Sequence, residues 1–336
     1  MAKRIVEIVL PKGRSDDIPQ LLHELTFDEY WLNTIDDNRA RIRILLATCD
    51  VEKVFDILEP YLLELPGASA VLINVEASIP RLDNEAAPMD TGELPEKKNK
   101  SARISRQELY NDINAAVGIN STYITMVELS AVVAAIGLIR NDMAIIIGAM
   151  VMAPLLVPNV AMALANTLGD TELAIKGSVA TGLGFLLALL TSIIIGVSFH
   201  IDPATPAIAA RTQLELSDLV LAVASGAAGV LAFTSGGQLS LIGVMVAVAL
   251  MPPLVSAGLL IGSGELNQGL KALELTFANV ICVNLAGIIT FVGQGIHPAT
   301  WWEKSKASRA KKIAISGWAF MFLVLVYIVL HEELQF

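Results

Sequence analysis

The chain has 336 residues, of which 54% are hydrophobic and only 17% are charged. Soluble globular chains carry about 25% charged residues, so the mean hydropathy of +0.62 argues against a purely soluble protein. An isoelectric point near 4.9, with no basic face that carries interleaved aromatic residues, argues against nucleic-acid binding.

Charge is concentrated in the first third of the chain. Residues 1–112 hold 14 Lys/Arg and 21 Asp/Glu, and the remaining 224 residues hold only 9 and 12. The two cysteines, Cys49 and Cys282, fall one in each part and lie in no metal-binding pattern. The apolar run after Met1 is cut short by Glu7, which argues against a secretory signal. We therefore expect a soluble cytoplasmic front end followed by a membrane domain.

The front end, residues 1–80, changes its hydrophobic period several times. The pattern predicts a strand over 4–10, a helix over 16–25, a hairpin of strands 30–34 and 41–47, a helix over 51–65 and a strand over 71–77. The order β-α-β-β-α-β predicts an α+β ferredoxin-like sandwich. Cytosolic modules of this shape, including ACT-type sensors, bind small effectors or pair with themselves, so we expect a homo-oligomer.

One short segment of the front end is a candidate effector site. Gly13, Arg14 and Ser15 precede the first predicted helix, where free backbone N–H groups and a guanidinium suit an anion. The alternative interpretation is an ordinary capped helix start after a turn.

A charged segment over 81–112 is predicted to be a solvated linker, because it has two prolines, many charges and almost no bulky apolar residues. The transmembrane domain, 113–336, then offers stretches close to the roughly 20 residues that cross a bilayer as a helix. Seven spans are predicted: 121–139, 143–165, 174–199, 216–235, 239–261, 270–294 and 313–331.

Cationic residues in the short connections predict the orientation. Lys176 and the basic segment 304–312 share a side with the linker, whereas Arg140, Arg211 and Lys271 lie on the other side. This distribution predicts a multi-pass inner-membrane protein with a cytoplasmic N-terminus and an extracytoplasmic C-terminus.

The transmembrane sequence resembles itself at an offset of 95 residues. Pro158, Gly169 and Lys176 align with Pro253, Gly264 and Lys271. The offset carries the first three spans, 121–205, onto the next three, 216–300. Moving by three spans reverses each helix, so a 3+3 inverted repeat plus one C-terminal span is predicted. Inverted repeats recur in secondary transporters, although some channels have them too.

Repeat-related prolines interrupt spans 2 and 5. A proline in a helix interior removes a hydrogen bond, so freed carbonyls and helix ends there are candidates for binding an ion or polar solute. Packing kinks satisfied by neighbouring helices are the alternative. The candidate residues are Pro154, Pro158 and Asn159 in span 2, and Pro252, Pro253 and Ser256 in span 5.

Other polar residues within the spans are further binding candidates. Glu128 lies near the centre of span 1, where a carboxylate is costly and predicts a proton or cation role. A neutral glutamic acid bonded to a neighbouring helix is the alternative. Thr125, Asn279 and Asn284 complete the predicted polar pathway.

The sequence carries no enzyme signature. Its four histidines are scattered, and it has no Walker loop and no dinucleotide fingerprint. We therefore expect no catalytic residues, no cofactor and no bound metal.

With these features in place, the chain resembles a widespread prokaryotic family of hydrophobic membrane proteins of unassigned function. The resemblance extends over essentially the whole chain and is most specific at Gly-Ala-Met-Val-Met-Ala-Pro-Leu-Leu, residues 148–156. It implies a multi-pass core fused to a cytosolic ferredoxin-like or ACT-like domain, and it carries over neither a substrate nor a catalytic residue.

Three functions follow as hypotheses. The first is a gradient-driven transporter of a small solute or ion, regulated by a cytosolic domain that binds a small effector. The second is an ion channel gated by that domain. The third is a membrane sensor or scaffold whose spans only anchor the cytosolic module.

Overall fold

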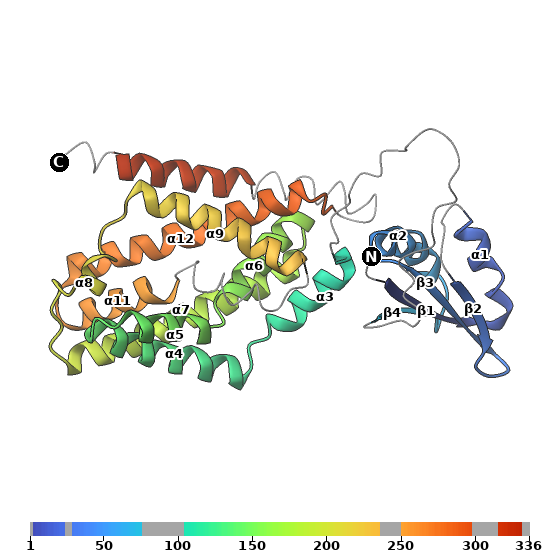
Figure 1. Cartoon of the computed structure of the whole chain (residues 1–336), viewed down its shortest axis with the longest axis horizontal. Coiled ribbons are helices and arrows are strands. Elements are labelled where there is room, and N and C mark those ends of the chain that lie inside the picture. The colour runs from blue at the N-terminus through green and yellow to red at the C-terminus, as the bar shows by residue number, and fades with distance from the viewer. Residues whose placement is uncertain (1–2, 24–28, 76–103, 236–249, 298–314, 331–336) are drawn as a thin grey trace, which may run out of the picture. The chain divides into compact units, whose positions relative to one another are not determined.

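The computed structural model describes residues 3–23, 29–75, 104–235, 250–297 and 315–330 (Figure 1). The chain divides into two compact units, Met1–Leu109 and Tyr110–Phe336. Most of the predicted linker and the first half of predicted span 5 lie outside the described residues.

The N-terminal unit is built on a four-stranded antiparallel sheet. Its strand order is β2-β3-β1-β4, so the first strand is central and pairs with both the third and the fourth. The elements in chain order are β1 (Lys3–Pro11), the short η1 (Lys12–Arg14), α1 (Asp17–Leu21), β2 (Glu29–Thr34), β3 (Arg39–Ala47), α2 (Thr48–Leu63) and β4 (Ser69–Asn74).

The core of this unit follows from the alternation of side chains along the two central strands. Every second residue of β1 and β3 is buried, and these residues pack against apolar side chains of α1 and α2. Gly67, at a φ of +80°, lies in the turn that leads from α2 towards β4. The predicted element order is therefore observed, with the first helix shorter than expected.

The second unit is helical. Its elements are α3 (Arg106–Ala116, which begins in the first unit), α4 (Ser121–Ile139), α5 (Met143–Met152), α6 (Leu156–Leu168), α7 (Thr171–Ser198), α8 (Pro206–Ala209), α9 (Leu216–Thr234), α11 (Met251–Gly262), α12 (Leu266–Gly293) and a helix over Ile315–Leu330. Helix α3 occupies the last part of the predicted linker.

Polar side chains at the helix starts explain why several helices begin where they do. Asn120 accepts a hydrogen bond from the N–H of Tyr123 at the start of α4, 2.7 Å away. Asp142 and Asp170 cap α5 and α7 in the same way, and Glu215 forms a capping box with Asp218 at α9.

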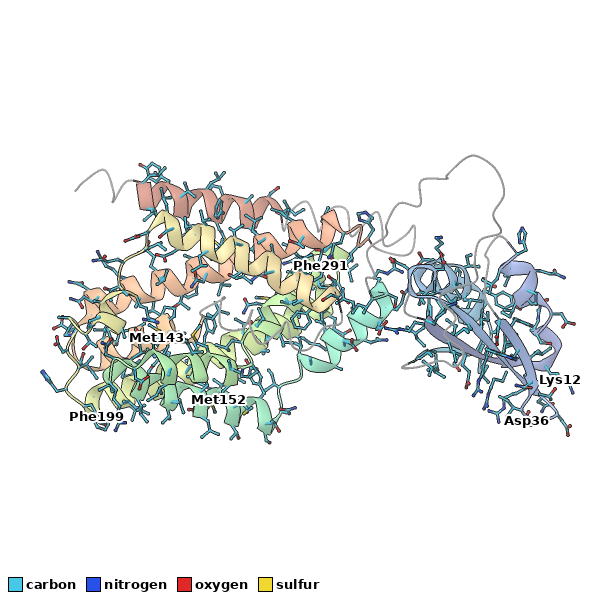
Figure 2. The ribbon with its side chains drawn as sticks, viewed as in Figure 1. Lys12, Asp36, Met143, Met152, Phe199 and Phe291 are labelled. Atoms are coloured by element: carbon cyan, nitrogen blue, oxygen red, sulfur yellow. The ribbon has the colours of Figure 1, made fainter. Side chains whose placement is uncertain are left out.

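Four of these helices, α4, α7, α9 and α12, are long and apolar enough to cross a membrane, and α5 with α6 forms a fifth candidate, bent by 49°. Large apolar side chains of these helices, such as Leu129, Ile194 and Leu231, are exposed. Met143 at the start of α5 and Phe199 directly after α7, both labelled in Figure 2, are exposed as well. Soluble proteins rarely expose so many apolar side chains together. The chain is therefore a membrane protein with four or five candidate spans among its described residues.

Candidate solute site in the helical unit

The break in predicted span 2 has a local cause. Ala153, at the end of α5, adopts an extended backbone with ψ of 115°, which is the conformation favoured for a residue that precedes proline. Pro154 then lies in the turn, and α6 begins at Leu156. The chain resumes as a helix in a new direction after only three residues.

The other three candidate prolines of the helical unit lie in the first turns of helices rather than in helix interiors. Pro158 is the third residue of α6, and Pro252 and Pro253 are the second and third residues of α11. First-turn N–H groups have no partner within a helix, so a proline there removes no hydrogen bond. The expected cost of an interior proline is therefore not incurred at these positions.

The two short helices that begin at these prolines are almost entirely buried. Helix α6 has 13 residues and α11 has 12, so each is about 18–20 Å long, shorter than the roughly 30 Å hydrocarbon core. Ten residues of each are buried, against α7 and α12 among other helices. Two helices that are too short to cross the membrane alone thus pack between longer helices.

A buried amide pair joins α6 to α12. Asn284 donates from Nδ2 to Oδ1 of Asn159 at 3.1 Å, and both side chains are fully buried. Each amide also donates to the carbonyl four residues earlier: Asn159 to Leu155 at 2.8 Å and Asn284 to Val280 at 2.9 Å. Asn159 and Asn284, which were separate candidates in the sequence, are therefore hydrogen-bonded to each other.

Two buried polar atoms of this region have no hydrogen-bond partner. They are Oδ1 of Asn284 and Oγ of Ser256, which belongs to α11. Helices α11 and α12 pack against each other. Because native proteins satisfy nearly all buried polar atoms, these two atoms are candidates for contact with a ligand or water.

Glu128 belongs to a second polar contact. Its carboxyl group accepts a hydrogen bond from the hydroxyl of Thr191 on α7, so the side chain is bonded to a neighbouring helix. Thr125 is exposed on α4, and Asn279 is buried in α12. In the described part of the chain, no hydrogen bond joins the Glu128 pair to the asparagine pair.

Sequence reasoning did not identify Thr191 or Tyr123. The phenol of Tyr123 donates to the carbonyl of Ala180 at 2.7 Å, next to Gly184, where a Cβ would collide with the ring hydroxyl. A hydroxyl within an apolar span gives no sequence pattern that identifies its hydrogen-bond partner. Gly184, which lies against the Tyr123 hydroxyl, was the one sequence feature that indicated a close contact here.

Helix boundaries repeat along the helical unit at the offset found in the sequence. Adding 95 to the bounds of α4 gives those of α9, and adding 95 to those of α7 gives those of α12. The starts of α6 and α11 are related in the same way. Gly169 and Gly264, also 95 apart, have φ angles of +74° and +95°.

Contacts between the two halves also recur when 95 is added to one residue number and subtracted from the other. A Cβ on Gly287 of α12 would lie 2.8 Å from Cβ of Ala163 on α6. The residues 95 positions away are Ser192 of α7 and Gly258 of α11, and these two also touch. The pairs α6–α12 and α7–α11 thus occupy corresponding positions.

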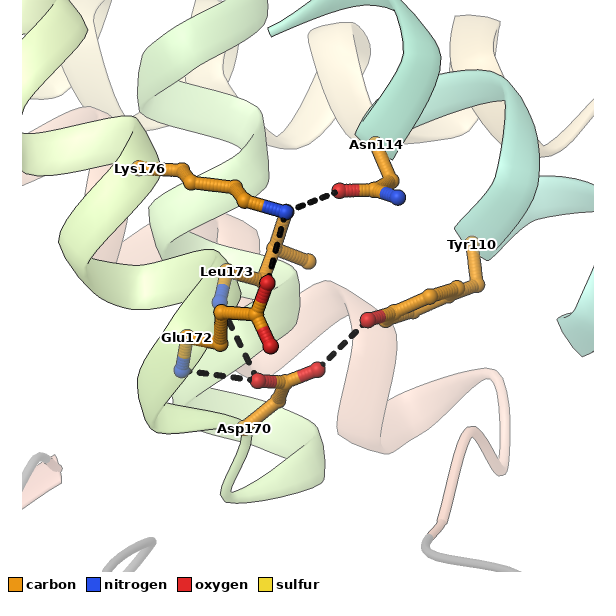
Figure 3. A network of polar contacts seen from close by, with 6 residues as sticks. All are labelled: Tyr110, Asn114, Asp170, Glu172, Leu173 and Lys176. Carbon is orange, nitrogen blue, oxygen red and sulfur yellow. Dashed lines mark hydrogen bonds and ion pairs between the residues drawn. The ribbon is translucent and has the colours of Figure 1, made fainter.

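A polar network lies where α3 contacts the connection between α6 and α7 (Figure 3). The phenol of Tyr110 donates to Asp170 at 2.7 Å, and this bond raises the pKa of Tyr110 to about 12, with a further contribution from burial. Lys176 bonds to Asn114 at 3.4 Å and pairs with Glu172 at 2.8 Å. The C-terminal end of α6 is therefore tied to α3.

The predicted effector residues lie in the N-terminal unit around η1. The guanidinium of Arg14 pairs with Asp17 at 3.2 Å, and Oγ of Ser15 donates to the carbonyl of Lys12 at 2.9 Å. Asp17 also accepts a hydrogen bond from the phenol of Tyr61 at 2.5 Å. These polar groups are thus engaged with one another, and helix α1 behind them is only five residues long.

Within the described residues, no group of three or more His, Cys, Asp or Glu side chains is arranged to hold a metal ion. The candidate site is therefore built from amides, hydroxyls and one carboxylate.

Comparison with known proteins gives two similarities. Residues 150–285, which include α6, α11 and the asparagine pair, match the family described as DUF389, a domain of unknown function. The chain is also 32% identical over 296 residues to the uncharacterized protein MJ0678 of Methanocaldococcus jannaschii, covering 87% of this chain and 88% of that protein. No solved structure matches the chain.

Proposed function

The chain belongs to the DUF389 family, and we propose that it transports a small solute or ion across the membrane by alternating access. The observation that carries the proposal is the pair of short, buried, proline-initiated helices between longer helices related by a repeat.

The first support is the direction of the helices. Only two residues separate α6 from α7 and three separate α11 from α12, so each pair runs antiparallel. Gly258 lies against Leu189 and Ser192, and Gly262, one turn later, lies against Ile193 and Val197. These contacts advance together, so α7 and α11 are parallel. It follows that α7 and its counterpart α12 run in opposite directions.

Opposite directions at a 95-residue offset are what an inverted repeat requires. On this proposal the predicted span 239–261, of which the structure describes residues 250–261, and the helix Ile315–Leu330 complete seven crossings. Two similar halves can rock against each other so that a central site opens to either side. The exchange of the α6–α12 and α7–α11 contacts supports a twofold relation between those halves.

The second support is chemical. Asn159, Asn284 and Ser256 place buried polar atoms beside the starts of the short helices, where a solute can exchange its hydration for protein oxygens and amides. Glu128, held by Thr191, supplies an ionisable group within a span and is the proposed proton or cation carrier. The second half has no equivalent carboxylate, because Val223 occupies the corresponding position.

The N-terminal unit is proposed to be a ferredoxin-like regulatory domain. Its strand order, with the first strand between the third and fourth, supports this fold. Helix α3 begins in that unit, where Arg106 pairs with Asp56 at 2.6 Å. Its later residues belong to the helical unit, where Tyr110 bonds to Asp170 between α6 and α7, and Asn114 bonds to Lys176 of α7.

The location proposed for this domain rests on the distribution of cations. The basic residues of the connections support a cytoplasmic N-terminal unit and an extracytoplasmic C-terminus. Domains of this shape commonly pair with themselves, so a homo-oligomer is part of the proposal.

The test is solute flux in proteoliposomes, measured across a panel of ions and small metabolites. We expect saturable uptake that is driven by an opposing gradient, and we expect Glu128→Gln to reduce it at least tenfold. Glu59→Gln, which neutralises an exposed carboxylate of the N-terminal unit, is the matched control and should leave uptake unchanged.

The outcomes separate the hypotheses. Flux that does not saturate and ignores opposing gradients would indicate a channel. No flux for any solute in the panel would favour a sensor or scaffold.

A further inference from the structure

We infer that the asparagine pair of α6 and α12 binds a monovalent inorganic cation through oxygen atoms. The inference deepens the proposed transport function and rests on it, since it names the class of ion that the central site takes. It starts from the one side-chain atom of the pair that is left without a partner.

The orientation of both amides is fixed by backbone carbonyls. The carbonyl of Leu155 requires a donor, so the Nδ2 of Asn159 faces it and its Oδ1 faces Asn284. The carbonyl of Val280 likewise requires the Nδ2 of Asn284, which also donates to Asn159. Turning either amide over would bring oxygen against oxygen. Oδ1 of Asn284 is therefore left as a buried acceptor, which a hydrogen-bond donor or a cation would satisfy.

The surroundings of the pair are short of donors. Pro158 has no N–H, so the first turn of α6 offers no backbone donor at the position directly before Asn159. Asn159 follows Pro158 directly, so its side chain belongs to the same helix start. Oxygen atoms without donors are the ligands that hard cations prefer.

Prolines also decide against an anion. A helix N-terminus binds anions through the free N–H groups of its first turn. Two of the first three residues of α11 are prolines, and so is the third residue of α6, which removes those donors. The first turn of α6 thus lacks one, and the first turn of α11 two, of the N–H donors that an anion would need.

The charge of the site decides between monovalent and divalent cations. All the buried polar side chains described in the helical unit are neutral amides and hydroxyls, and in the described residues no acidic cluster suits a metal. Divalent ions are held in proteins by carboxylates, whose charge offsets their larger hydration energy. A neutral oxygen site fits sodium, potassium or ammonium better.

The experiment measures binding without flux. The full-length protein in detergent is melted in sodium, potassium or ammonium chloride and in choline chloride, at constant ionic strength. We expect one of the three small cations to raise the melting temperature by roughly 5 °C in a saturable manner, relative to choline.

Two variants locate the effect. Asn284→Leu should abolish the cation-dependent shift, whereas Thr167→Val should retain it. Thr167 is also fully buried, but its hydroxyl already has a partner, because it donates to the carbonyl of Ala163 at 2.8 Å. If Asn284→Leu does not fold, Asn284→Ser takes its place and should weaken the apparent affinity about tenfold.

The outcomes are decisive in both directions. Equal melting in all four salts, as expected for a site filled by water, would overturn the inference, and so would a shift that survives both changes at Asn284. A failed binding test leaves solute flux in proteoliposomes as independent evidence for transport. A cation shift without flux would retain the site and remove the transport function.

Discussion

The two halves of the helical unit share their helix boundaries but differ in chemistry and burial. In α7, 33% of an apolar stretch of 18 residues is buried, whereas 78% of such a stretch is buried in its counterpart α12. Leu189 stands in the first half where Asn284 stands in the second, and Leu254 stands where Asn159 would be repeated. The scaffold is thus duplicated, whereas the polar groups on it are not.

The residues that shape the helices therefore differ from the residues that are proposed to bind a solute. Repeated glycines and first-turn prolines set where helices end, turn and approach each other, as at Pro158 and Pro253 or Gly169 and Gly264. On the proposed function, the polar residues that occur in one half only, Asn159 and Asn284, decide what the central region binds. A duplicated frame with one unduplicated polar centre is expected to give one site that both halves enclose.

The largest effect expected concerns the direction of the two halves. In a background with both native cysteines replaced, Lys176→Cys and Lys271→Cys should react with a membrane-impermeant maleimide from opposite sides of the membrane, because an inverted repeat places equivalent residues on opposite faces. Both lysines are exposed. The measurement is labelling of right-side-out and inside-out vesicles, with Lys53→Cys reporting the side of the N-terminal unit. Labelling of both positions from one side would refute the inversion.

A smaller but clear effect is expected at the contact between α7 and α11. A Cβ on Gly196 would collide with backbone atoms of Leu259, so Gly196→Ala should destabilise the protein by about 1–3 kcal/mol. Gly182 of the same helix has no heavy atom of a neighbour within 4 Å of the position that a Cβ would take, and Gly182→Ala is the control. Thermal unfolding in detergent measures both. Equal melting temperatures for the two variants would mean that the helices do not touch at Gly196.

The smallest effect is expected at the connection that α3 contacts. Tyr110→Phe removes the hydrogen bond to Asp170 and should lower the stability by about 1 kcal/mol at neutral pH. Because the folded-state pKa of Tyr110 is raised to about 12 from 10, the stabilisation is complete below pH 10 and is lost as the pH rises through about 12.

Unfolding of the wild-type and Tyr110→Phe proteins between pH 7 and pH 11 measures this difference. Asn114→Leu tests the neighbouring contact with Lys176 independently. A difference that grows with pH over this range would contradict the assignment.

Much of the fold could be predicted from the sequence because helix ends are local. The predicted span 121–139 coincides with α4, and the predicted spans 174–199 and 270–294 differ from α7 and α12 by a few residues at most. Capping side chains and prolines fix these ends through the backbone hydrogen bonds of one turn. The 95-residue offset was visible for the same reason.

The candidate site was predictable only as a set of residues. Asn159 and Asn284 were both proposed, but nothing in the sequence paired them, and the partner of Glu128 was missed. In a soluble helix the polar side faces water, which reveals the inner face. In lipid both faces are apolar, so the pattern along α4 or α12 does not indicate which residues face a neighbour.

The sequence by itself determined that this chain is a membrane protein with a small α+β front end, where the long helices α4, α7, α9 and α12 begin and end to within a few residues, and at what interval they recur. Composition, caps and prolines act within one turn of the chain, and these suffice. Only the tertiary structure decided that the prolines begin buried half-length helices, that Asn159 meets Asn284 and that Glu128 is held by Thr191. These contacts join residues up to 125 positions apart, and their partners are selected by packing rather than by any local pattern.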